Sequence, residues 1–129
     1  FLGLLSDGGV HSHIEHLKGL VNAANEKELD KVFIHAFTDG RDTDPKSGLG
    51  FITTLTKHLQ NSIGKIATIS GRYYAMDRDK RWERVKLAYD CLVHNAGPRA
   101  TSATSALEAA YADRPGTAWY AAELAIFKI

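Results

Sequence analysis

Three short segments of this 129-residue chain concentrate the side chains that can do acid–base and anion-binding chemistry. Each is rich in Asp, His or Arg and follows a short apolar run: Ser6–His13 (SDGGVHSH), Thr38–Asp44 (TDGRDTD) and Ser70–Arg81 (SGRYYAMDRDKR). Arginine holds a carboxylate or a phosphate with a planar fork of donors, and an ionised aspartate can accept a hydroxyl proton. The three segments together predict a site for one small anion.

The third segment and the first residues after it, 70–86, carry six Lys and Arg residues against three Asp and Glu residues. Arg72 and Arg78 are the predicted ligand contacts, because both lie in or next to the loop. For Arg72 an equal alternative is a salt bridge that ties down the loop. Arg81, Arg84 and Lys86 are interpreted as a solvated helix face with ion-pair partners one turn away.

The second segment forms a tight turn, in which Gly40 permits a backbone angle that other residues avoid. Adjacent side chains of an extended segment point to different sides, so Arg41 can hold an anion while Asp42 accepts a hydroxyl proton. Asp39 is interpreted as a cap of the turn. Asp42 is therefore the predicted catalytic residue.

The first segment offers backbone and imidazole donors to the same anion. The paired Gly8 and Gly9 allow a close backbone approach, and a helix that starts at Ser12 presents free N–H groups. His11, next to that cap, is a predicted further donor.

A metal site in the same segment is a weaker hypothesis. His13 and His16 are one helical turn apart and Asp7 is close in sequence. No second carboxylate or supporting partner accompanies them, so solvated histidines on the first helical turn are the favoured interpretation.

Apolar runs and helical periodicity alternate along the chain and predict the elements that position these loops. FLGLL at the start, Lys31–Phe37 (KVFIHAF) and Lys65–Ser70 (KIATIS) are predicted strands, and the second is apolar enough to be covered on both faces. His35 within it is expected to be a near-core residue with a hydrogen-bond partner. The predicted fold class is α/β, a three-layer α/β/α arrangement of βαβ units around a mainly parallel sheet. In such sheets ligands bind beyond the carboxyl ends of the strands, where the three loops would meet.

Two helices are predicted from capping signals. Ser12 and Glu15 have the spacing of a capping box, and Asp44 with Pro45 can cap and begin the second helix. Apolar residues at helical spacing predict their buried faces: Ile14, Leu17, Val21 and Ala24 in the first, and Phe51, Ile52, Leu55 and Leu59 in the second.

A third helix is predicted from about Asp77 to Asn95, and a fourth over Thr101–Ala112. The final segment, Thr117–Ile129, fits a fourth strand or an extended packing arm, and the pattern does not choose between them. The predicted buried face of the third helix consists of Trp82, Val85, Tyr89 and Leu92.

Composition indicates one cytoplasmic domain over residues 1–129. The net charge of +1 gives no sign of a nucleic-acid or membrane partner, and no segment resembles a membrane span or a signal peptide. Cys91, the only cysteine, fits a reducing compartment and a buried, inert thiol. The chain opens at Phe1 without an initiator Met, which suggests a piece of something longer.

The motifs GLLSDGGVHSH, DGRDT and GRYYAMDRDKRW, in this order and at this spacing, resemble the cofactor-independent phosphoglycerate mutases. The resemblance runs from about Leu2 to about Asp90. It implies a glycolytic isomerase that interconverts 2-phosphoglycerate and 3-phosphoglycerate through a phosphoserine. It further implies that this chain is part of the transferase domain, and that a partner domain related to alkaline phosphatase carries the serine and two divalent metal ions, usually manganese.

By that resemblance the substrate-binding residues are His11, Arg41, Asp42, Arg72 and Arg78. The arginines would hold the carboxylate and phosphate of phosphoglycerate, and Asp42 would engage its free hydroxyls and assist proton transfer. Asp7, His13 and His16 are not metal ligands in that family.

Several family features have no counterpart in this sequence. The serine, the metal ligands and a further pair of arginines are missing, and Arg114 lies in the wrong context to replace one of that pair. The isolated chain is therefore expected to bind no metal, to bind substrate weakly and to be inactive. The alternative hypothesis is a non-catalytic α/β domain that binds a phosphorylated metabolite or a protein partner.

Overall fold

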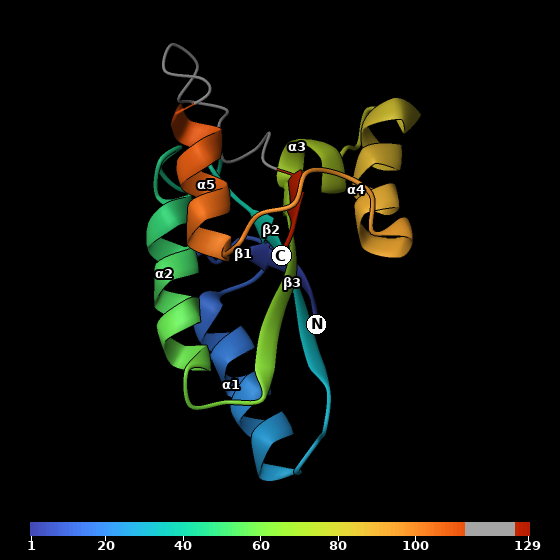
Figure 1. The fold of residues 1–129 in the computed structure, drawn as a ribbon. Coiled ribbons are helices and arrows are strands. Elements are labelled where there is room, and N and C mark those ends of the chain that lie inside the picture. Colours follow the sequence, from blue (N-terminus) through green and yellow to red (C-terminus); the bar gives the residue numbers. More distant parts are fainter. Residues whose placement is uncertain (113–125) are drawn as a thin grey trace.

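The computed structural model describes residues 1–112 and 126–129, and its secondary structure follows the predicted alternation of strands and helices (Figure 1). The elements in chain order are β1 (Leu2–Leu5), α1 (Ile14–Glu26), β2 (Val32–Thr38), α2 (Gly48–Leu59), β3 (Gly64–Gly71), α3 (Arg72–Ala75), α4 (Trp82–His94), α5 (Ala103–Ala112) and β4 (Ile126–Lys128).

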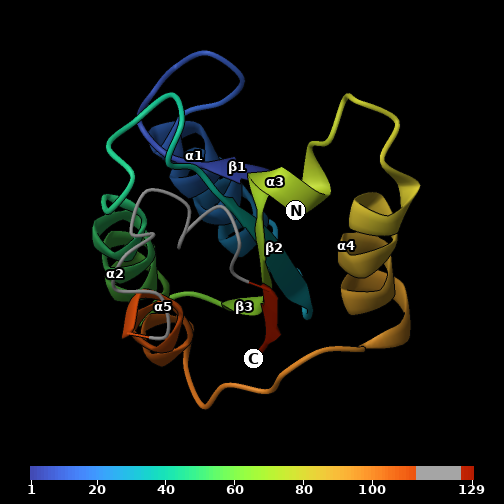
Figure 2. The ribbon, with the colours of Figure 1, turned by 90° about the horizontal axis from the view of Figure 1, so that it is seen from above.

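The strands form one sheet in the order β1-β2-β3-β4, with the first three parallel and β4 antiparallel to β3. Helices α1, α2 and α5 cover one face, and α4 lies on the other (Figures 1 and 2). The predicted three-layer α/β fold is therefore confirmed. Because β1, β2 and β3 run in one direction, the segments that follow them meet at one edge of the sheet.

The core fills the space between the sheet and the helices of the first face. The predicted apolar stripes of α1 and α2 supply much of it, and Ile52 and Leu55 are fully buried. The core residues from all the elements of this layer are Leu5, Ile14, Val21, Ile34, Ala36, Ile52, Leu55, Leu59, Ile69, Ala103, Ala106 and Leu107.

The second face of the sheet is more open than the sequence predicts. In β2 buried and less buried residues alternate, and Phe33 is 49% exposed, so the prediction of a strand covered on both faces is wrong. His35, on the same face as Phe33, is partly buried, and its Nδ1 lies 2.9 Å from Thr68 Oγ1, as expected for a near-core histidine.

Helix α4 packs on β3 and β4 through small side chains. Ala88 and Cys91 are its buried residues, whereas Trp82 is 71% exposed and Tyr89 is also exposed, so the predicted buried face is wrong for these two aromatic residues. The spacing of the large residues pointed to one face, but the small residues let the helix backbone approach the sheet. Burial raises the pKa of the Cys91 thiol, in agreement with an inert buried cysteine.

Two predicted helix caps are wrong. The N-cap of α1 is His13, whose Nδ1 accepts a hydrogen bond from the Glu15 N–H, while Ser12 donates its hydroxyl to the carbonyl of Leu4. Helix α2 begins at Gly48, because Asp44 closes a separate turn before it. In both places the polar side chain hydrogen-bonds another backbone group instead of a group at the helix terminus.

Only some of the C-terminal residues for which we made predictions are described by the structure. Helix α4 ends as predicted, with Asn95 in the left-handed conformation, but it begins at Trp82, so the predicted start near Asp77 is wrong. Helix α5 occupies most of the predicted fourth helix. Residues 126–128 form a strand, while 113–125, with Arg114, lie outside the described residues. In the part of the chain that the structure describes, every helix is too short or too polar to span a bilayer.

Candidate functional site

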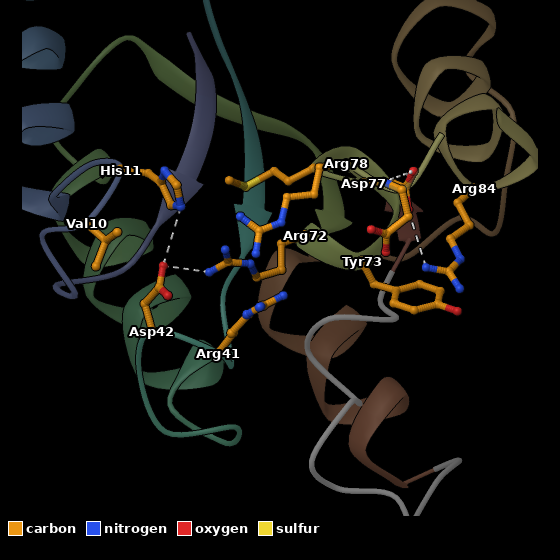
Figure 3. Close-up of a pocket in the computed structure, with 11 residues that line it drawn as sticks. Val10, His11, Arg41, Asp42, Arg72, Tyr73, Asp77, Arg78 and Arg84 are labelled. Atoms are coloured by element: carbon orange, nitrogen blue, oxygen red, sulfur yellow. Dashed lines mark hydrogen bonds and ion pairs between the residues drawn. The ribbon is translucent and has the colours of Figure 1, made fainter. Parts of the chain in front are cut away.

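A cavity of about 340 Å³ lies where the loops after β1, β2 and β3 meet (Figure 3). All five residues predicted to bind the anion line it, so the structure brings together the three loops that the sequence singles out. Its lining residues are Val10, His11, Arg41, Asp42, Arg72, Tyr73, Met76, Asp77, Arg78, Asp79 and Arg84.

Asp39 is the buried anchor of the second loop, although it does not line the cavity. Its Oδ1 accepts hydrogen bonds from the backbone N–H groups of Gly40, Arg41 and Asp42 at 2.9–3.0 Å, and its Oδ2 accepts one from the Ser6 hydroxyl at 2.7 Å. Asp39 therefore caps the turn, as predicted. Burial alone would raise its pKa, but the hydrogen bonds from Arg41, Arg72 and Ser6 outweigh burial and lower the pKa of Asp39 to about 2.

Arg72 ties the third loop to the second. Its Nη1 donates to Asp39 Oδ1 at 2.8 Å and to Asp42 Oδ2 at 2.7 Å, and its side chain is only 10% exposed. Burial opposes the charged form, yet the two carboxylates outweigh it and raise the pKa of Arg72. The salt-bridge alternative is thus observed, while the guanidinium also borders the cavity.

Asp42 and His11 lie together at one side of the cavity (Figure 3). His11 Nε2 is 3.8 Å from Asp42 Oδ2, and the Asp42 side chain is 18% exposed. The first loop packs directly on Asp42, because a Cβ built on Gly8 would lie 3.2 Å from Asp42 Cβ and 3.3 Å from Thr43 Cγ2. A glycine at position 8 therefore lets the first loop pack closely on the second.

Arg41 and Arg78 supply the unpaired positive charge. Both are exposed and line the cavity, and neither forms an ion pair with another described residue. Arg72 pairs with Asp42 and Arg84 pairs with Asp77. Arg41 and Arg78 are therefore the lining arginines whose charge is available to attract an anion. Two such charges of one sign beside the same cavity raise the local concentration of anions.

Arg84 is one of the lining residues that the sequence did not single out. Its side chain is 21% exposed and its Nη1 is 3.4 Å from Asp77 Oδ1, while its Cζ lies 3.9 Å from the centre of the Tyr73 ring. The prediction that Arg84 belongs to a solvated face is therefore wrong, whereas Lys86 pairs one turn along with Asp90 as predicted. Helical periodicity could not predict the contact between Arg84 and Tyr73, because these residues lie in two separate helices, α4 and α3.

The histidines of the first loop do not assemble a metal site with other residues. Among residues 1–112 and 126–129, no three His, Cys, Asp or Glu side chains gather as metal ligands would. The His13 and His16 rings are 5.9 Å apart at their centres, and His13 Nδ1 is engaged in capping α1.

Asp39 is expected to make the stability of this domain depend on acid. Its folded-state pKa is below the ordinary value of 3.8, so its contribution is fully present above about pH 4 and is lost as the pH falls toward 2. The shift corresponds to about 2 kcal/mol. Urea unfolding at several pH values should show this loss in the wild-type chain and not in Asp39→Asn.

The matched control for the acid experiment is Asp30→Asn, because Asp30 is exposed between α1 and β2. This variant should keep the wild-type pH profile. A wild-type profile in Asp39→Asn as well would show that Asp39 is not the source of the acid sensitivity.

The family model described as "BPG-independent PGAM N-terminus" matches residues 1–121 of this chain. The 2,3-bisphosphoglycerate-independent phosphoglycerate mutase of Clostridium novyi (strain NT) is 60% identical over 114 residues, which are 88% of this chain and 22% of that protein. The protein of the same name from Flavobacterium johnsoniae is 59% identical over 111 residues, or 86% of this chain and 22% of that protein. The chain thus spans about a fifth of the length of these relatives.

A solved structure also resembles the fold. The chain of Leishmania mexicana phosphoglycerate mutase, determined at low cobalt concentration, superposes with a TM-score of 0.86 at 30% sequence identity. The match covers 98% of this chain and 24% of the Leishmania chain.

Proposed function

This chain belongs to the 2,3-bisphosphoglycerate-independent phosphoglycerate mutase family, whose N-terminal region it matches, and we propose that its cavity binds phosphoglycerate. The observation that carries the proposal is a pair of arginines, Arg41 and Arg78, that have no ion-pair partner among the described residues and lie with Asp42 and His11 in one cavity. In this proposal the chain is part of the transferase domain of a cytoplasmic, glycolytic enzyme.

The chemistry of the substrate matches the charges of the cavity. Phosphoglycerate carries a carboxylate, a phosphate and one free hydroxyl, so it needs cationic donors and one base. Arg41 and Arg78 hold the two anionic groups with charge-assisted hydrogen bonds, and Arg72 adds positive charge beside Asp42. The volume of about 340 Å³ lies in the usual range for small-molecule sites.

Asp42 acts as the base in this proposal. When the phosphoryl group passes to a hydroxyl of the glycerate, its bond to the serine oxygen breaks, and the hydroxyl must lose its proton as the new P–O bond forms. The Asp42 carboxylate takes that proton. Arg72 holds the carboxylate in place, because its Nη1 bridges Asp42 and the buried Asp39. His11 contacts the substrate and its phosphate from the first loop.

Other parts of the reaction lie outside this chain in our proposal. The serine that carries the phosphoryl group and two divalent metal ions, taken as manganese, belong to the phosphatase domain of the same protein. No group of three His, Cys, Asp or Glu side chains that could hold a metal ion occurs among the described residues, which supports this division of roles. The roles assigned to this chain are therefore substrate binding, orientation and proton transfer.

Turnover by a full-length protein that contains this sequence tests the proposal. We expect conversion of 3-phosphoglycerate to 2-phosphoglycerate without added 2,3-bisphosphoglycerate, measured by coupling the product to enolase. Binding of 3-phosphoglycerate without any turnover would contradict the enzymatic role and favour a non-catalytic domain that binds a phosphorylated metabolite.

A further inference from the structure

We infer that Asp77 and Arg84 are positioning residues that hold Arg78 in the cavity. This inference rests on the proposed role of Arg78 in substrate binding and adds the structural device that aims it. Arg78 itself has no ion-pair partner among the described residues, so the direction of its side chain depends on the backbone of its loop.

The Asp77 carboxylate fixes the backbone on the C-terminal side of Arg78. Its Oδ2 accepts hydrogen bonds from the N–H of Asp79 at 3.2 Å and from the N–H of Arg81 at 2.9 Å. Between these two donors Lys80 has a φ of 59°, a left-handed conformation that a lysine adopts only when its surroundings impose it. The carboxylate thus closes a tight loop around the residue that follows it, which is Arg78.

Arg84 fixes the Asp77 carboxylate in turn. The Asp77 side chain is 2% exposed, and Arg84 Nη1 lies 3.4 Å from its Oδ1, the oxygen that does not serve the loop backbone. A buried carboxylate without a cationic partner is costly, so Asp77 is expected to turn toward water when Arg84 is removed. The loop would then lose both hydrogen bonds.

Tyr73 holds the guanidinium of Arg84 from the opposite side. The guanidinium carbon is 3.9 Å from the Tyr73 ring centre, and Tyr73 stands edge-on to Tyr74 in α3, with ring centres 5.3 Å apart. Figure 3 shows Tyr73, Arg84 and Asp77 grouped on one side of the cavity, with Arg78 nearer Arg72. Because Arg84 already has a carboxylate and a ring as partners, its function is to support the loop, and Arg78 is left to meet the ligand.

A double-mutant cycle in a full-length mutase that contains this sequence tests the inference. Arg84→Gln should lower kcat/KM about tenfold when Arg78 is present, because a small displacement of a binding group is costly. In the R78A background the same change should have less than about a twofold effect, because the group that it positions is gone. Lys86→Ala, on the same helix but paired with Asp90, should leave kcat/KM unchanged.

The cycle separates positioning from other roles. A tenfold loss in both backgrounds would overturn the inference, since it would mean that Arg84 acts directly on the ligand or on overall stability. In the protein that keeps Arg78, Arg84→Lys should be more active than Arg84→Gln. If Arg84→Lys is no more active than Arg84→Gln although its thermal unfolding is unchanged, that result would also count against the inference. If Arg84→Gln does not fold, Asp77→Ala replaces it in the cycle, because alanine removes the acceptor of both loop N–H groups together with the ion pair.

The result for Arg78→Ala alone distinguishes this inference from the proposed function. If that variant keeps full activity, the proposed role of Arg78 fails. If it is impaired but Arg84→Gln and Asp77→Ala are not, only the positioning inference fails.

Discussion

Replacing Arg78 with alanine is expected to lower kcat/KM of a full-length enzyme containing this sequence by about 100- to 10,000-fold. A guanidinium that meets a phosphate or carboxylate makes charge-assisted hydrogen bonds worth roughly 1.5–3 kcal/mol each, and two such bonds are lost together. Arg78 lines the cavity and has no ion pair among the described residues, so this charge is free to meet a ligand. Steady-state kinetics with 3-phosphoglycerate measure the loss.

The matched control for Arg78 is Lys31→Ala, which removes a cation at the opposite edge of the sheet, just before β2. It should keep wild-type kinetics. Arg78→Lys should recover only part of the activity, because an ammonium group supplies the charge without the planar fork. A kcat/KM within about twofold of wild type in Arg78→Ala would show that Arg78 does not contact the substrate.

Asp42→Asn is expected to lower kcat by about 100- to 10,000-fold, the usual contribution of general acid–base catalysis. Asparagine has the shape of aspartate and can still accept a hydrogen bond from Arg72, whose second partner is the buried Asp39. The geometry of the loop should therefore survive, while the ability to take a proton is lost. A fall in kcat with a much smaller change in KM is the expected signature.

Asp30→Asn, exposed between α1 and β2, is the matched control for the loss of one carboxylate. It should not change kcat. If Asp42→Asn instead raises KM and leaves kcat unchanged, Asp42 binds the substrate hydroxyl without acting as a base, and the proposed proton transfer is wrong.

The fold and the place of the site could be predicted because both follow from simple physical rules. The apolar runs that became β1, β2 and β3 are separated by helical periodicity, so they must form a parallel sheet. The loops that follow parallel strands lie together at the carboxyl ends of those strands. His11, Arg41 and Arg78 therefore line one cavity although they are far apart in sequence.

The prediction failed where the outcome depends on contacts between separate elements. The spacing of Arg84 along its helix predicts a solvated position. In the structure α3 and α4 meet so that Arg84 contacts Tyr73 and Asp77 instead. The burial of α4 was misjudged for a related reason. Ala88 and Cys91 are too small to give a strong apolar signal, yet they are the residues over which the helix meets the sheet.

Competition between polar groups explains the misplaced caps. Ser12 has the right spacing from Glu15 to cap α1, but its hydroxyl donates to Leu4 and thereby ties the first loop to β1. Asp39 shows the opposite case, since its role as a turn cap could be predicted from the local sequence alone. The pairing of Arg72 with Asp39 and Asp42 could only be left as an alternative, because it joins residues 30 or more positions apart.

Titration of the ¹⁵N-labelled chain with 3-phosphoglycerate tests the central claim, that this cavity binds phosphoglycerate, most directly. We predict saturable amide shifts at millimolar ligand in the loops that carry His11, Arg41 and Arg78, and much weaker binding by the Arg78→Ala variant. No response at millimolar ligand, or shifts confined to residues away from the three loops, would contradict the claim.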